Sequence, residues 1–123
     1  MSEQELVVVV TGAAGRISYS LIPHLCDGSI FGTQAKLRLR LLDVEAMVPR
    51  LEGVKMEIQD CNYMLVTDIL CTCKAKDAFE GADVCVLLGG FPRLPGMERK
   101  DLIGKNVEII KQHATAIDTF AKK

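Results

Sequence analysis

The 123-residue sequence predicts an α/β fold, in which helices cover both faces of a parallel β-sheet. Short apolar runs of strand length alternate along the chain with segments whose apolar residues recur at helical spacing. The first run, "LVVVV" at residues 6–10, passes directly into a turn that carries Gly12 and Gly15. Continuous apolar runs of this kind are typical of strands buried on both faces, as in parallel sheets. The order strand, helix, strand, helix, strand, strand, helix therefore favours a doubly wound sheet.

The predicted strands cover residues 6–10, 36–43, 66–72 and 84–88, and the predicted helices cover residues 17–26, 46–60 and 97–122. Residues 76–83 form a short helix or turn between the last two strands. Pro23 either kinks the first helix or falls in its first turns, whereas Pro49 lies near the start of the second, where proline is tolerated. We expect the last helix in two pieces around Gly104. No repeat or linker divides the chain, so it is one domain or part of one.

Composition narrows the functional classes. Fifteen basic and sixteen acidic residues give a net charge of −1, which provides no reason to expect nucleic acid or an anionic membrane as a partner. No apolar run approaches the roughly 20 residues of a spanning helix. The N-terminus, "MSEQE", is acidic where a signal peptide is basic, so we expect a cytoplasmic protein.

The cysteines predict neither disulfides nor a metal site. Their number is odd, no CxxC pair occurs, and neither His24 nor His113 lies near one of them in sequence. We therefore expect reduced thiols that pack as small hydrophobic side chains. They are Cys26, Cys61, Cys71, Cys73 and Cys85.

The glycine turn after the first strand has the character of an anion site. Glycine permits a tight turn and a close backbone approach, and the free N–H groups of the following helix attract a phosphate. The dinucleotide fingerprint G-x-G-x-x-G is incomplete, because Val10 replaces its first glycine. Asp43, at the end of the second strand, could accept hydrogen bonds from both ribose hydroxyls and repel a 2′-phosphate, which favours NAD over NADP. A plain glycine turn and a helix-capping Asp43 remain the alternatives.

A second informative stretch, "LLGGFPRLPGMERKDL" at residues 87–102, follows the fourth strand. The carboxyl ends of parallel strands are where ligands bind in such folds. Arg93 and Arg99 could point inward when this loop closes, one holding a carboxylate with its planar fork and the other polarising a carbonyl. A solvated basic loop is the alternative.

Taken together, "VTGAAGRI", "LLD", "GVKMEIQDC" and "GGFPRLPGMERKDLIGKNVEIIK" resemble the cytosolic malate dehydrogenases of the NAD-dependent malate/lactate dehydrogenase family, from Val9 almost to Lys123. The resemblance implies a Rossmann-type domain and interconversion of malate and oxaloacetate, a reaction of the tricarboxylic acid cycle. It also implies a homodimer to which the helices after the first and second strands could contribute.

The resemblance also implies residue roles. Asp43 would hold the adenosine ribose, and Asn106 would lie near the cofactor, although the residues alone would make Asn106 an ordinary polar helix position. Arg93 would bind the substrate carboxylate that distinguishes dicarboxylic acids from lactate, and Arg99 would contact the substrate near its carbonyl. The pyrophosphate loop would consist of Gly12, Ala13, Ala14, Gly15, Arg16, Ile17 and Ser18.

Three positions depart from the family pattern. Arg16 stands where most cytosolic relatives have glutamine. Its side chain could strengthen NAD binding or simply point to solvent. Leu94 replaces a second consecutive cation, which leaves the pair of Arg93 and Arg99 intact. His113 replaces a glutamine that lies near the cofactor in relatives.

The chain is also short for the family, whose catalytic histidine and aspartate lie in a second half. We therefore expect residues 1–123 to form a truncated N-terminal NAD-binding domain, with four strands and their helices and without the catalytic C-terminal domain. The fourth strand becomes an unpaired apolar edge, so the isolated chain should be poorly stable, prone to association and inactive. One hypothesis is that the chain is the N-terminal portion of a malate dehydrogenase. The other is a short, non-catalytic protein that binds a nucleotide or docks onto an assembly.

Overall fold

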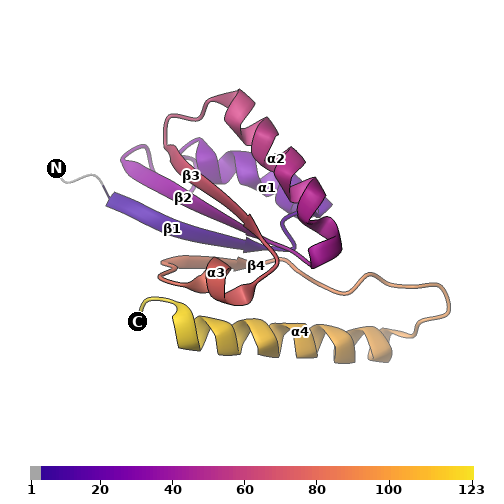
Figure 1. Cartoon of the computed structure of the whole chain (residues 1–123). Coiled ribbons are helices and arrows are strands. Elements are labelled where there is room, and N and C mark those ends of the chain that lie inside the picture. Colours follow the sequence, from indigo (N-terminus) through magenta and orange to yellow (C-terminus); the bar gives the residue numbers. More distant parts are fainter. Residues whose placement is uncertain (1–3) are drawn as a thin grey trace.

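Four parallel strands form a single sheet in the computed structural model, which describes residues 4–123 (Figure 1). The first three residues of the acidic N-terminus lie outside the described residues. The strands are β1 (Gln4–Thr11), β2 (Ala35–Leu42), β3 (Val66–Thr72) and β4 (Val84–Leu87). Their spatial order is β3-β2-β1-β4, which matches the first four strands of the doubly wound order. The predicted parallel α/β sheet is confirmed.

Helices cover both faces of this sheet (Figure 1). On one side lie α1 (Arg16–Cys26) and α2 (Val48–Cys61), the latter preceded by a 3₁₀ turn, η1 (Glu45–Met47). On the other side lie α3 (Ala75–Phe79) and α4 (Arg99–Phe120). Each predicted helix is present, and residues 75–79 show that the short segment before β4 is helical.

The valine run of β1 supplies both halves of the core. Val8 and Val10 belong to the apolar cluster under α1 and α2, and Val7 and Val9 belong to the cluster under α3 and α4. Successive side chains of a strand point to opposite faces, so a strand covered on both sides must be apolar at every position. The continuous run is therefore a consequence of the central place of β1 between β2 and β4.

One detail of the helices differs from the prediction, and one alternative for Pro23 is excluded. α4 is one continuous helix, and Gly104 lies exposed within it rather than between two pieces. A single interior glycine costs about 1 kcal/mol relative to alanine, which a helix of 22 residues with a capping box at its start can absorb. Pro23 lies in the last turn of α1 rather than in its first turns, so the N–H that it lacks affects only the end of the helix.

Part of the apolar surface is uncovered. In the part of the chain that the structure describes, β4 pairs with β1 alone, and Leu87 at its end is 41% exposed. α4 has a single buried residue, Ala116. A stripe at helical spacing along α4 is exposed and consists of Ile103, Val107 and Ile110. The expectation that β4 is an edge strand is thus met by the described sheet.

No helix among residues 4–123 has the length and apolar character needed to cross a membrane. The same residues contain no group of three or more His, Cys, Asp or Glu side chains arranged to hold a metal ion. The five cysteines are free thiols, and burial raises the pKa of Cys26 to about 12 and that of Cys71 to about 11.

Candidate functional site

The turn between β1 and α1 is built on a close contact between two glycines. Gly12 has a φ of +61°, in the left-handed region that favours glycine. A Cβ atom added to Gly12 would lie 2.7 Å from the Cα atom of Gly89, which follows β4. No side chain fits in that space, so position 12 requires glycine for the turn to lie against the chain that leaves β4.

The N–H groups of this turn divide into two sets. Those of Ala13, Ala14 and Gly15 donate to protein acceptors, namely the Leu42 carbonyl, an Asp43 carboxylate oxygen and the Gly12 carbonyl. The N–H groups of the next three residues, at the start of α1, have no hydrogen-bond acceptor among residues 4–123; they are those of Arg16, Ile17 and Ser18. Unsatisfied N–H groups in the first helical turn, together with the helix dipole, form an anion site.

The side chains of these three residues differ in their surroundings. Ser18 is buried, and its hydroxyl donates to the Gly12 carbonyl at 2.8 Å, so this side chain closes the turn. Arg16 is exposed, and Ile17 is 69% exposed although it is apolar. The surface beside the free N–H groups is therefore open, and its walls are a cation and an aliphatic side chain.

Asp43 lies immediately after β2 and faces the glycine turn. One carboxylate oxygen accepts the Ala14 N–H at 3.0 Å, and the other accepts the Val44 N–H at 2.8 Å. The capping alternative is not observed, because η1 begins after Val44 without a side-chain cap. A carboxylate has about four lone-pair sites, so each oxygen can still accept another donor.

The arginine loop, defined here as residues 88–98, runs from the end of β4 to the start of α4 and extends beyond the sheet (Figure 1). Arg93 is exposed in the middle of the loop, and Arg99 is exposed at the first position of α4. Neither guanidinium makes an ion pair or a hydrogen bond with any other described residue. The structure therefore shows neither arginine bonded to the glycine turn.

Two positioning contacts were not foreseen from the sequence. Thr11 is fully buried, and its hydroxyl oxygen accepts the N–H groups of Leu88 and Gly89, both at 3.1 Å. Asn106 on α4 accepts the Phe91 N–H on its side-chain oxygen at 2.7 Å. A threonine at the end of a buried valine run was a signal for the first contact, because a buried polar group needs a partner.

Neither histidine lies at the candidate site. The ring of His113 packs against Phe79 of α3 with centroids 5.8 Å apart, and burial lowers the pKa of His113. His24 is exposed in the last turn of α1. Neither residue borders the glycine turn or the arginine loop, so the described chain presents no histidine there to act as a base.

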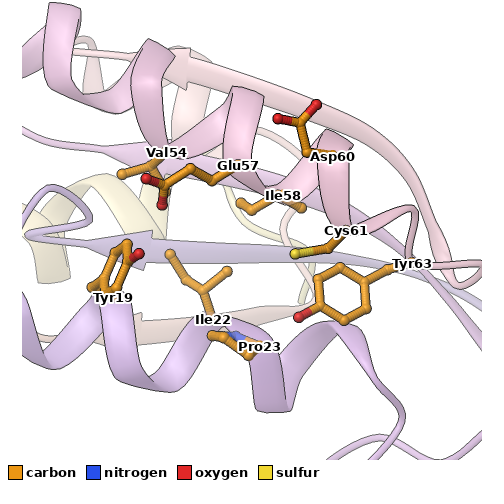
Figure 2. Close-up of a pocket in the computed structure, with 9 residues that line it drawn as sticks. All are labelled: Tyr19, Ile22, Pro23, Val54, Glu57, Ile58, Asp60, Cys61 and Tyr63. Carbon is orange, nitrogen blue, oxygen red and sulfur yellow. The ribbon is translucent and has the colours of Figure 1, made fainter.

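A separate groove of about 370 Å³ lies between α1 and α2 (Figure 2). Tyr19 and Tyr63 lie at opposite ends of the groove, and Ile22 and Ile58 lie between them (Figure 2). The groove is mainly apolar, and its acidic rim includes Glu57. It runs along the sides of the helices and is distinct from the glycine turn.

These features define a class of protein. A parallel sheet of order 3-2-1-4, a glycine turn with free helix N–H groups, and an acidic residue after the second strand are the parts of a Rossmann-type dinucleotide-binding domain. Comparison with known proteins then identifies the family. Residues 6–123 match the lactate/malate dehydrogenase NAD-binding domain, and the chain belongs to this family.

The relatives agree with this assignment. The chain is 48% identical over 116 residues to human cytoplasmic malate dehydrogenase, covering 94% of this chain and 35% of the human protein. The crystal structure of Naegleria fowleri malate dehydrogenase superposes with a TM-score of 0.94 at 38% identity, covering 99% of this chain and 37% of that one. Trichomonas vaginalis lactate dehydrogenase, solved with NADH and oxamate, gives 0.86 at 33% identity, with 95% and 35% covered. The chain thus spans about a third of the length of these relatives.

Proposed function

We propose that this chain is the NAD-binding portion of a malate dehydrogenase and serves NAD-dependent hydride transfer between malate and oxaloacetate in the full-length enzyme. The observation that carries the proposal is the set of free N–H groups at the start of α1, which lies beside the carboxylate of Asp43. The 48% identity to a cytoplasmic malate dehydrogenase supports the choice of substrate.

The cofactor's pyrophosphate is held by the N–H groups of Arg16, Ile17 and Ser18. Gly12 and Gly15 allow the backbone to come close to the pyrophosphate. The Ala13 N–H holds the turn to the end of β2, and the Ala14 N–H holds it to Asp43. The remaining lone pairs of Asp43 accept the ribose hydroxyls, and its negative charge disfavours a 2′-phosphate. When bound, NAD supplies the acceptor for the hydride.

The substrate is held by the arginine loop, through Arg93, and by the start of α4, through Arg99. Arg93 binds the carboxylate that is remote from the reacting carbon, because its guanidinium fork matches a carboxylate bidentately. Arg99 contacts the substrate near its carbonyl and stabilises negative charge on the oxygen. Both guanidinium groups are exposed, so closure of the loop is needed to bring them to the cofactor.

Nucleotide binding is tested by titrating the 123-residue chain with NADH and with NADPH, followed by nicotinamide fluorescence. NADH is expected to bind more tightly than NADPH. Asp43→Asn, which keeps an acceptor for the Ala14 N–H, is expected to lose about tenfold or more in NADH affinity, since hydrogen bonds to charged groups contribute roughly 1.5–3 kcal/mol. Asp118→Asn removes an exposed carboxylate on α4 and serves as the charge-matched control. If the chain binds NADH and NADPH with equal affinity, and Asp43→Asn leaves both affinities unchanged, the proposal is contradicted.

Catalysis requires a base for the hydroxyl proton, and neither His24 nor His113 is placed to supply one. The isolated chain is therefore expected to give no malate-dependent NADH formation. A signal from the pure chain that disappears in Arg99→Ala would overturn this expectation.

The alternative function, a non-catalytic nucleotide-binding or docking protein, is favoured by the exposed β4 edge and by the apolar stripe of α4. An intact mass near 13.5 kDa for the protein from its natural source would favour this alternative.

The proposal includes a homodimer, with a second copy of the chain covering the groove between α1 and α2. The groove is mainly apolar, and Tyr19 on its rim is 56% exposed. Tyr19→Arg places a charge there and is expected to shift sedimentation toward the monomer, whereas Tyr63→Phe is not. A monomeric parent chain would contradict this part of the proposal.

The names of the relatives support a cytoplasmic location, which cell fractionation tests.

A further inference from the structure

The first residues of the arginine loop are held at two points. Asn106 accepts the Phe91 N–H on its side-chain oxygen at 2.7 Å. The neighbouring Gly90 also lies against the amide of Asn106, because a Cβ atom added to Gly90 would be 3.3 Å from the same oxygen. The loop backbone therefore leaves β4 in direct contact with α4.

The second point of attachment comes from β1. The hydroxyl of Thr11 accepts the N–H groups of Leu88 and Gly89, and Gly12 fits directly onto Gly89. Thr11 immediately precedes the glycine turn. The root of the loop, residues 88–91, is thus joined on one side to the anion site and on the other side to α4.

The outer part of the loop has few contacts. Residues 92–96 are exposed, and the Met97 N–H donates to the Leu94 carbonyl in a single turn. The far end is fixed again by the capping box, in which Glu98 and Asp101 bond to each other's backbone N–H groups. Loops with few buried contacts open at low free energy, so the two fixed ends determine where the outer part can move.

The helix geometry connects these ends. Asn106 follows Arg99 by roughly two turns of α4, which places both on one face about 10 Å apart along the axis. Arg93 follows the tethered Phe91 after a single proline, Pro92, whose φ is fixed by its ring. The bond between Asn106 and Phe91 therefore sets the position of one substrate arginine relative to the helix that carries the other.

We infer that Asn106 is a positioning residue, which locks the root of the arginine loop to α4 through the Phe91 N–H and keeps Arg93 and Arg99 in register. Its side-chain oxygen is occupied by this bond, so Asn106 does not depend on the cofactor for its partner. The purpose of the register rests on the proposed function, but the contact itself does not.

The test is amide hydrogen exchange of the ¹⁵N-labelled 123-residue chain. Asn106→Leu removes the acceptor and is expected to accelerate exchange of the Phe91 amide by about fivefold, since a hydrogen bond contributes roughly 1 kcal/mol net. Asn106→Asp keeps a side-chain oxygen at the same place and is expected to restore protection. Lys105→Met, which removes the cation 4.4 Å from the Phe91 ring centroid, is the matched control and should leave Phe91 protected.

Exchange of amides in the core distinguishes a local effect of Asn106→Leu from a loss of overall stability. The Val8 and Leu39 amides, in the centre of the sheet, should exchange at parental rates in Asn106→Leu. Unchanged Phe91 exchange, or equal acceleration at Phe91 and Val8, would overturn the inference. Failure of the parent chain to bind NADH would contradict the proposed function alone.

Discussion

Replacement of Thr11 by valine tests the junction between β1 and the arginine loop. Valine has nearly the same shape as threonine, but it lacks the oxygen that accepts the N–H groups of Leu88 and Gly89. Thr11 is fully buried, so water cannot replace that oxygen without rearrangement. The substitution therefore leaves two donors without a partner while changing little else.

The expected loss of stability follows from these two donors. A buried donor left unsatisfied costs about 1–3 kcal/mol, so two cost about 3 kcal/mol in total when both values lie toward the lower end. Domains of this size are stable by only about 5–15 kcal/mol. For a chain of this length, such a loss lowers Tm by roughly 12 °C.

Urea denaturation followed by circular dichroism measures this loss as a fall in the midpoint at constant m value. Thr11→Ser is the matched control, because it keeps the hydroxyl and loses one methyl group, at about 1 kcal/mol. Thr11→Val is therefore expected to be less stable than Thr11→Ser. If the valine variant equals or exceeds the serine variant in stability, the two hydrogen bonds do not hold this junction.

Three further substitutions are predicted. Gly12→Ala should abolish stable folding, measured by urea denaturation, because its Cβ atom would lie 2.7 Å from the Cα atom of Gly89 at a φ of +61°. Gly104→Ala should instead stabilise the chain by roughly 0.5–1 kcal/mol in the same assay, because this helical glycine has open space around it; a loss of stability would contradict the continuity of α4. The hydrogen bond from Lys122 lowers the pKa of Asp83, so its contribution to stability is present at neutral pH and lost as the pH falls below about 4. Asp83→Asn should therefore flatten the acid side of the stability profile, and an unchanged acid limb would refute this assignment.

Local sequence predicted most of the sheet. The valine run of β1 and the alternating leucines of β2 each repeat a pattern that neighbouring residues alone produce, so their strands were placed to within about two residues. The break expected at Gly104 was wrong, because a helix end is decided by capping and packing as well as by propensity. Pro23 lies inside the first helix as predicted, and the structure excludes only the alternative that placed it in the first turns.

The contacts of the candidate site likewise fall into those that local sequence predicts and those that it does not. Gly12 and Asp43 each follow directly from the end of a strand, which brings the glycine turn and Asp43 together through the Ala14 N–H, and the prediction recognised that relation. The Thr11 contacts join residues 77 and 78 positions apart, and no local pattern specifies such a pair. Asn106 was expected near the cofactor, but the sequence could not indicate that its oxygen contacts a backbone N–H of the loop.

The strand order has a consequence for how the chain folds. β1, β2 and β3 precede β4 in the sequence, so these three neighbouring strands leave the ribosome before β4 does. The part of the candidate site that contains Asp43 and the glycine turn can thus form early. The Thr11 hydroxyl must wait for Leu88 and Gly89 to emerge. Translation therefore supplies the strands on one side of β1 before the strand on its other side, and the arginine loop is the last part of the site to be attached.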